Sequence, residues 1–305
     1  MNVSTAYIAV VLIWSTTPLG IVWSSESVHP TLAVLLRMLI ALILGLLLIK
    51  INRISLPWHR DAVKLYLFSA LGIFGGMLLS YYAAQYISSG LISLIFGLAP
   101  ILSGVIAQKL IHEPKFTLTK KIALVVALIG LFIVCLDNLL LSQNGYIGII
   151  LVLFAVLFFS LSGVLVKSIT ITIHPLSTTI GALLLCTPLF LLVWLIFDGS
   201  LNYQQWQLRS ILAIVYLGVF GSLIGFIAYF YVLQKLTAST VALITMITPV
   251  LALSLGALLN NEHVSFNLMI GAVFVVTGLT CFQWSTKVSA SMKKRLRNSH
   301  TKTRF

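Results

Sequence analysis

Charged residues are scarce in this chain. Asp, Glu, Lys and Arg make up 8% of the 305 residues, whereas 60% are hydrophobic. A typical soluble domain is about a quarter charged and about half apolar, so this sequence has too little polar surface to cover a water-soluble fold. We therefore predict an integral membrane protein. Because apolar runs recur from end to end, we expect no soluble domain of useful size.

Cysteines and catalytic motifs are also sparse. Cys135, Cys186 and Cys281 are widely separated and show no C-x-x-C spacing, which disfavours both disulfides and metal binding. The sequence contains no H-E-x-x-H, G-x-S-x-G or G-x-x-x-x-G-K-[ST] motif. Its histidines lie in loops, at span ends or in the tail. We predict no enzyme activity, no cofactor and no metal site.

Long apolar runs are what the sequence has instead. A membrane-spanning helix needs about 20 predominantly apolar residues. Helices are predicted over barrel strands, because barrel strands are only about ten residues long and alternate in polarity. We expect an all-α polytopic membrane protein with ten spans, roughly at residues 3–23, 31–49, 65–86, 89–110, 119–136, 145–168, 175–197, 209–233, 238–259 and 266–284.

The positive charges fall almost entirely on one side of these spans. With the N-terminus inside, every Lys and Arg except Arg37 and Arg209 lies at an inner span end, in an inner loop or in the tail 285–305. Cytoplasmic loops carry such an excess, so we predict that both termini are inside. This placement explains the net charge of +13 without nucleic acid as a partner. We expect the basic cytoplasmic tail to lie near anionic lipid.

The six acidic residues all lie at span ends or in loops. A small cation/proton antiporter needs a carboxylate at mid-membrane to bind cation and proton alternately. The lack of such a group disfavours that mechanism and fits zwitterionic, neutral or anionic compounds better. Glu113 is a gating candidate, whereas a solvated helix end is the simpler interpretation of Glu262.

The chain contains an internal repeat. VLIWS at 11–15 matches VLFFS at 156–160, and LGIFGG further along matches LGVFGS. These matches pair a first five-helix repeat, residues 1–137, with a second, residues 145–284. Because five is odd, the second copy enters the membrane upside down. A repeat of inverted topology is a signature of secondary transporters.

Longer stretches carry a resemblance to a known family. They are LIWSTTPLG in the first span, HPTLAVLLRMLIAL in the second, and LGIFGGMLLSYYAAQYISSGLISLIFGLAPILSGVIAQKLIHE with its counterpart LGVFGSLIGFIAYFYVLQKLTASTVALITMITPVLALSLGALLNNE. Over nearly the whole chain except the tail, the sequence resembles EamA-type transporters of the drug/metabolite transporter superfamily. The resemblance implies ten helices in two inverted five-helix repeats around a central cavity, and transport, commonly export, of small metabolites or drugs. One departure is Ser15, which follows Trp14 where the family usually has Gly.

The leading hypothesis is a secondary, alternating-access transporter that exports small polar metabolites, amino-acid-like compounds among them, across the inner membrane of a bacterium. Alternatives within transport are efflux of toxic or amphipathic drugs and uptake of a metabolite. Outside transport, the alternative is a membrane receptor or assembly protein. Without a nucleotide-binding loop, transport would be driven by gradients. The expected partners are a small-molecule substrate and the lipid bilayer, with monomer or homodimer left open.

Arg37 is the one charge well inside a predicted span, away from both of its ends. A lone guanidinium in hydrocarbon is costly, and three interpretations stay open. The side chain snorkels to the outer headgroups, it anchors a neighbouring helix or gates, or it contacts a substrate carboxylate or phosphate in the cavity. The repeat aligns Arg37 with Ala182, so the charge is not a symmetric packing requirement. The resembled family typically carries Arg here.

Further candidates lie at aromatic, polar and proline positions, many of them paired by the repeat. Pro100 and Pro249 lie mid-helix, where each frees a backbone carbonyl, and such irregular backbone is tolerated only beside protein or a cavity. Gln85 and Gln234 lie near opposite membrane faces and are, with Glu113, the gating candidates. The predicted substrate-binding or cavity-lining residues are Trp14, Ser15, Arg37, Tyr82, Phe96, Pro100, Phe159, Ser160, Tyr231, Thr245 and Pro249.

Overall fold

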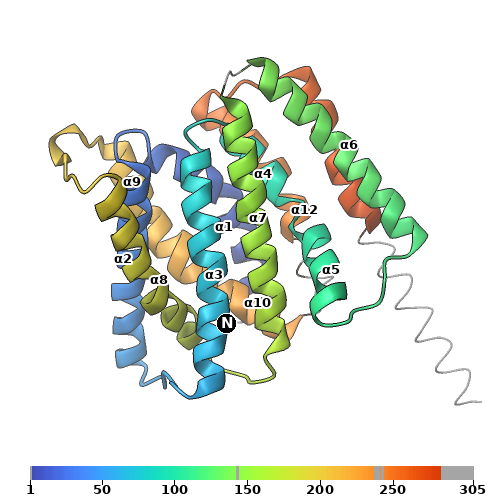
Figure 1. Ribbon diagram of the computed structural model, residues 1–305. Helices are drawn as coiled ribbons and strands as arrows, with labels where there is room; N and C mark the ends of the chain where they lie inside the picture. Colours follow the sequence, from blue (N-terminus) through green and yellow to red (C-terminus); the bar gives the residue numbers. More distant parts are fainter. Residues whose placement is uncertain (1, 142–143, 237–240, 242–243, 283–305) are drawn as a thin grey trace, which may run out of the picture.

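The computed structural model describes residues 2–141, 144–236, 241 and 244–282, without the side chains of 136–141, 245 and 246. The predicted basic tail thus lies outside the described residues. Throughout the described part the secondary structure is helical, as Figure 1 shows. Eight segments are long and apolar enough to cross a membrane, and two shorter apolar helices follow them. The predicted all-α polytopic architecture is therefore confirmed.

The first half of the chain forms six helices whose starts follow from local chemistry. Asn2 caps the first of them by accepting a hydrogen bond from the N–H of Thr5 at 2.7 Å. Pro30 begins the second, at a position where a missing N–H is not needed. In chain order the helices are α1 (Val3–Ser24), α2 (Pro30–Ile51), α3 (Arg60–Ala83), α4 (Ser89–Phe96), α5 (Ala99–Leu110) and α6 (Leu118–Leu141).

The second half of the chain again begins with two long helices. Pro175 begins the second of these, as Pro30 does in the first half. The elements are α7 (Gly145–Ser168), α8 (Pro175–Phe197), the short 3-10 helix η1 (Tyr203–Gln205), α9 (Leu208–Tyr216), η2 (Leu217–Ile224), α10 (Gly225–Lys235), α12 (Ile244–Asn260) and a final helix, Phe266–Phe282.

Two predicted spans are not continuous α-helices. The span 89–110 is divided into α4 and α5 just before Pro100, whose ring and missing N–H disfavour a helix interior. The span 209–233 contains the π-helix η2, at whose end the N–H of Gly225 bonds the carbonyl of Phe220, five residues back. π-Helical segments occur mostly as single turns at functional sites, and η2 borders the cavity described below.

Small residues allow close contacts at several helix crossings, among them those of α3 with α7 and of α6 with the final helix. Where α3 crosses α7, a Cβ atom on Gly72 would lie 2.5 Å from Ser162 Oγ. The Ser162 hydroxyl donates to the carbonyl of Phe68 at 2.7 Å. At one flank, α6 and the final helix lie side by side (Figure 1), and a Cβ on Gly130 would lie 2.6 Å from the carbonyl oxygen of Gly271. Such small faces are typical of packed membrane helices.

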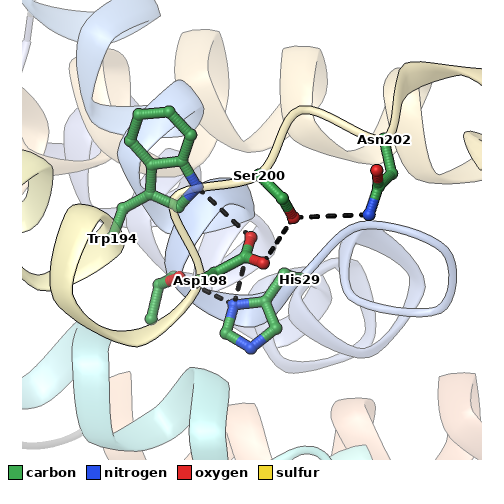
Figure 2. A network of polar contacts seen from close by, with 6 residues as sticks. His29, Trp194, Asp198, Ser200 and Asn202 are labelled. Atoms are coloured by element: carbon green, nitrogen blue, oxygen red, sulfur yellow. Dashed lines mark hydrogen bonds and ion pairs between the residues drawn. The ribbon is translucent and has the colours of Figure 1, made fainter.

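Polar contacts join the two halves at one end of the bundle, which we call the upper face and define by the loop 25–29 and Asp198 (Figure 1). Nδ1 of His29, at the start of α2, lies 3.8 Å from the Asp198 carboxylate at the end of α8 (Figure 2). Asp198 also accepts hydrogen bonds from Trp194 Nε1 at 3.3 Å and from Ser200 Oγ at 2.6 Å. This network connects a helix of the first half to one of the second.

Candidate functional site

A cavity lies between the two halves of the chain, about halfway along α1 and α7. Its volume is about 80 Å³, counted as the space open to the centre of a water molecule. One water needs about 10–15 Å³ on that measure, so the cavity has room for a small molecule. The lining residues come from both halves: Trp14, Thr17, Pro18, Ile21, Arg37, Met77, Ser80, Ile92, Ser93, Phe96, Ala99, Phe159, Gly221, Phe226 and Thr248.

Arg37 of α2 alone carries a charge among the described lining residues. Its side chain is 1% exposed, so it does not snorkel to the protein surface. Its Nε donates a hydrogen bond to Ser222 Oγ in η2 at 2.7 Å. Its Nη1 is buried and has no hydrogen-bond partner in the described part of the chain, where no carboxylate pairs with it either. The cavity wall therefore contains a buried cation with an unused donor.

The π-helix η2 positions this guanidinium through two glycines. A Cβ atom on Gly218 would lie 3.2 Å from the carbonyl oxygen of Arg37, and one on Gly221 would lie 3.1 Å from Arg37 Nη2. Because both residues lack a Cβ, η2 approaches α2 closely enough for Ser222 to reach Arg37.

The Arg37–Ser222 pair has no counterpart in the other half. The internal repeat aligns Arg37 with Ala182, and the LGIFGG/LGVFGS match aligns Ser222 with Gly76. Both members of the polar pair are thus replaced together by small residues. The packing of these helices in the two halves does not in itself require a cation.

Aromatic side chains form one wall of the cavity. The ring of Trp14 lies 5.6 Å from that of Phe159 at 76° and 5.0 Å from that of Tyr229. Phe159 also contacts Phe96, with ring centroids 6.2 Å apart. We call Trp14, Phe96 and Phe159, three of the rings that line the cavity, the aromatic cluster. Edge-to-face pairs of this kind are favourable, and they present a large apolar surface to the cavity.

The predicted cavity residues fall into two groups. Trp14, Arg37, Phe96 and Phe159 line the cavity together. The two predicted prolines each follow a lining residue in the sequence. Pro100 follows Ala99, and the buried Pro249 follows Thr248.

The remaining predicted cavity residues make other contacts. Ser15 donates to the carbonyl of Val11 within α1 at 2.6 Å, and Ser160 donates to the carbonyl of Ala99 at 3.2 Å. The ring of Tyr82 lies 6.4 Å from that of Phe197. Tyr231 packs against the core of the bundle, and the side chain of Thr245 lies outside the described residues.

The gating candidates lie near the ends of helices. Gln85 and Glu113 are exposed, whereas Nε2 of Gln234 donates to the carbonyl of Ile173 at 2.8 Å, which connects α10 to the segment before α8. In the part of the chain that the structure describes, no group of three His, Cys, Asp or Glu side chains could hold a metal ion.

Glu262 is not the solvated helix end that we predicted. Its carboxylate accepts hydrogen bonds from the N–H groups of Ser89 at 3.1 Å and Gly90 at 3.2 Å, which begin α4. Unpaired N–H groups and the helix dipole favour an anion at this position. Asn260, after which α12 ends, donates to Glu262 at 3.1 Å and accepts from Trp23 Nε1 at 2.8 Å. We call these five residues the Glu262 clasp; it connects α1, α4 and α12 at the upper face.

Comparisons with known proteins agree along nearly the whole chain. The model of the EamA-like transporter family matches residues 3–136 and 146–283. The sequence is 27% identical to an uncharacterized transporter, YoaV, of Bacillus subtilis over 92% of this chain and 96% of that protein. It is 25% identical to the protein PagO of Salmonella typhimurium over 92% of each chain. One solved crystal structure has the same fold, with a TM-score of 0.67 at 18% identity, over 92% of this chain and 96% of that one.

Proposed function

Because this chain belongs to the EamA-like transporter family, we propose that it is a secondary transporter that exports small polar metabolites, amino-acid-like compounds among them, across the inner membrane of a bacterium. The observation that carries the proposal is the cavity between the two halves, with Arg37 and the aromatic cluster in its walls. In carriers built from inverted repeats, the substrate site lies near the bilayer midplane where the repeats meet.

Alternating access supplies the mechanism. When two similar halves of opposite topology exchange conformations, a site between them opens first to one side of the membrane and then to the other. The Glu262 clasp holds α4 against α12 at the upper face. Opening the cavity toward that face therefore involves release of the clasp. Gln234 and Ile173 both belong to the second half. An exchange of conformations between the two halves would strain the hydrogen bond between them.

The cavity wall favours a second candidate within transport, the efflux of amphipathic compounds. Apart from Arg37 and a few hydroxyl groups, the lining residues are apolar or aromatic. Apolar walls with a few polar groups are typical of small-molecule sites, and they would accept compounds with a substantial hydrophobic part. The two candidates differ in the substrates that they predict, so one assay separates them.

The test is flux through the purified full-length protein in liposomes, screened with amino acids, other polar metabolites and amphipathic dyes. Saturable flux of polar metabolites supports the first candidate, and saturable flux of dyes alone supports the second. A lack of saturable flux for every compound would reject transport.

A pair of variants on α7 tests whether the transported compound passes through the cavity. Phe159 lines the cavity, whereas Phe154 on the same helix is 52% exposed and faces away from the protein. We expect Phe159→Ala to lower the initial rate about tenfold, because a large part of one cavity wall is lost, and Phe154→Ala to leave it within about twofold. Equal rates for the two variants would place the transport pathway elsewhere.

A further inference from the structure

We propose that the substrate of this cavity is a small organic anion whose carboxylate binds Arg37 and whose apolar body lies against the aromatic cluster. The inference rests on the proposed transport function. It replaces the amino-acid-like compounds of that proposal with monoanionic carboxylates that have an apolar body and no ammonium group. Its starting point is the juxtaposition of a buried, partly unsatisfied guanidinium with an apolar cavity of about 80 Å³.

The charge of Arg37 is the first argument. A buried cation is strongly disfavoured unless an anion or several hydrogen-bond acceptors compensate it. In the described part of the chain, one hydroxyl group, that of Ser222, accepts from Nε, and no carboxylate pairs with the guanidinium. Nη1 remains without a partner there, and Arg37 lines the cavity. A bound anion would provide the missing acceptor and compensate the charge.

The number of charges argues for a single carboxylate. Guanidinium donors match the two oxygens of a carboxylate, and charge-assisted hydrogen bonds of this kind are the stronger ones. The described lining contains one cation and no second Lys, Arg or His that would balance a dianion. It also contains no Asp or Glu that would pair with a substrate ammonium group. A monoanion therefore fits the lining better than a dianion or a cation.

The remaining lining residues select the body of the substrate. Two of the cavity hydroxyls already donate within their own helices, Thr17 to the carbonyl of Ile13 at 2.7 Å and Ser80 to that of Gly76 at 2.6 Å. They are therefore poor donors for further anionic groups. The lining also includes the rings of Trp14, Phe96 and Phe159. An aromatic or other apolar body is expected to lie against these rings while the carboxylate contacts Arg37.

The test compares ligands that differ in charge and little in shape. Binding of benzoate, benzamide and benzylamine to the purified full-length protein in detergent is measured by titration calorimetry and by thermal stabilisation. We expect benzoate to bind about tenfold or more tightly than benzamide, because a charge-assisted bond replaces a neutral one, and benzylamine to bind most weakly. Equal binding of benzoate and benzamide, stronger binding of benzylamine, or no binding of benzoate would overturn the inference.

Variants then locate the effect. Arg37→Gln should abolish the preference for benzoate over benzamide, and Arg37→Lys should keep part of it, because Lys retains the charge without the planar fork. Arg60→Gln removes the same charge from an exposed position at the start of α3 and should leave the preference unchanged. A full preference in Arg37→Gln would also overturn the inference. If Arg37→Gln does not fold, the ligand series on the wild-type protein and on Arg37→Lys still tests the inference.

Flux in liposomes distinguishes this inference from the proposed function. Saturable flux of neutral or cationic compounds without flux of carboxylates would leave a transporter and remove the anion as its substrate. A lack of saturable flux for every compound would instead reject transport itself. Flux of benzoate or phenylacetate that is lost in Arg37→Gln and kept in Arg60→Gln would support both.

Discussion

The guanidinium of Arg37 has one donor that is hydrogen-bonded within the protein and one that is not. Nε is bound to Ser222, whereas Nη1 has no partner in the described residues. A side chain that served only as a helix anchor would be expected to have all of its buried donors satisfied. The free donor is what separates binding from anchoring, and flux measurements on two substitutions can resolve the two roles.

We expect Arg37→Ala to yield a folded, membrane-inserted protein whose flux falls by about tenfold or more, because a charge-assisted contact to the substrate is lost. Arg37→Lys should restore the rate only in part, since an ammonium group cannot keep the Ser222 bond and bind a carboxylate with the same geometry. The measurement is the initial rate per inserted molecule in liposomes. Wild-type rates in Arg37→Ala would reduce the residue to a structural role.

The sequence singled out Arg37 as a charge within an apolar run, but it could not identify Ser222 as its partner. The two residues are 185 positions apart, and their contact depends on how η2 packs against α2. Glu262 was misinterpreted for a related reason. Its partners, the N–H groups of Ser89 and Gly90, belong to the backbone. Nearly every residue has a backbone N–H, so the residue types do not show which of them bind a carboxylate.

Among the helices, the crossing of α3 and α7 gives the clearest test of packing. A Cβ on Gly72 would lie 2.5 Å from Ser162 Oγ, whereas one on Gly76, a turn later in α3, would have its nearest neighbour at 3.7 Å. We expect Gly72→Ala to destabilise the protein by about 1–3 kcal/mol through overpacking. Gly76→Ala should be neutral or stabilise it by up to about 1 kcal/mol, because Ala is the better helix former.

Thermal unfolding in detergent, followed by the signal of the native helices, measures both substitutions. The expected result is a lower midpoint for Gly72→Ala and an unchanged or higher one for Gly76→Ala. Equal midpoints would show that α7 moves aside at this crossing.

Element positions were predictable where one physical signal dominates. Apolar length alone located the spans, because membrane thickness fixes how long a helix must be. The division of span 89–110 could have been predicted, since Pro100 disfavours a continuous helix. The π-helix η2 could not have been predicted, because LGVFGS resembles LGIFGG in residue type while the corresponding stretch of α3 remains α-helical.

At the scale of the whole molecule, the Glu262 clasp is the contact whose release alternating access would involve. Glu262→Gln keeps the size of the side chain and removes its charge, so the bonds to the N–H groups of Ser89 and Gly90 weaken. We expect hydrogen exchange of these two amides to accelerate about tenfold or more, which corresponds to the loss of charge-assisted hydrogen bonds. Hydrogen-exchange mass spectrometry of the peptide around 88–91 makes the measurement.

Glu113→Gln is the matched control, because Glu113 follows α5 as Glu262 follows α12. In both places the N–H of the Glu bonds a carbonyl six residues back, Ala107 in one case at 3.2 Å and Gly256 in the other at 3.1 Å. Glu113→Gln should leave the exchange of Ser89 and Gly90 unchanged. The same acceleration in both variants would mean that α4 opens without involvement of the clasp.

Arg37, the one cation among the described residues of the cavity wall, has an electrical consequence. A cavity that contains Arg37 alone carries one positive charge, and the same cavity with a bound monoanion is neutral, so the membrane potential acts mainly on the empty carrier. One charge moved through 100 mV corresponds to about 2.3 kcal/mol. A potential that is negative inside would draw the empty carrier back toward the cytoplasmic side, and export of the anion would speed up. Flux at clamped voltages would show this as a current that vanishes in Arg37→Gln.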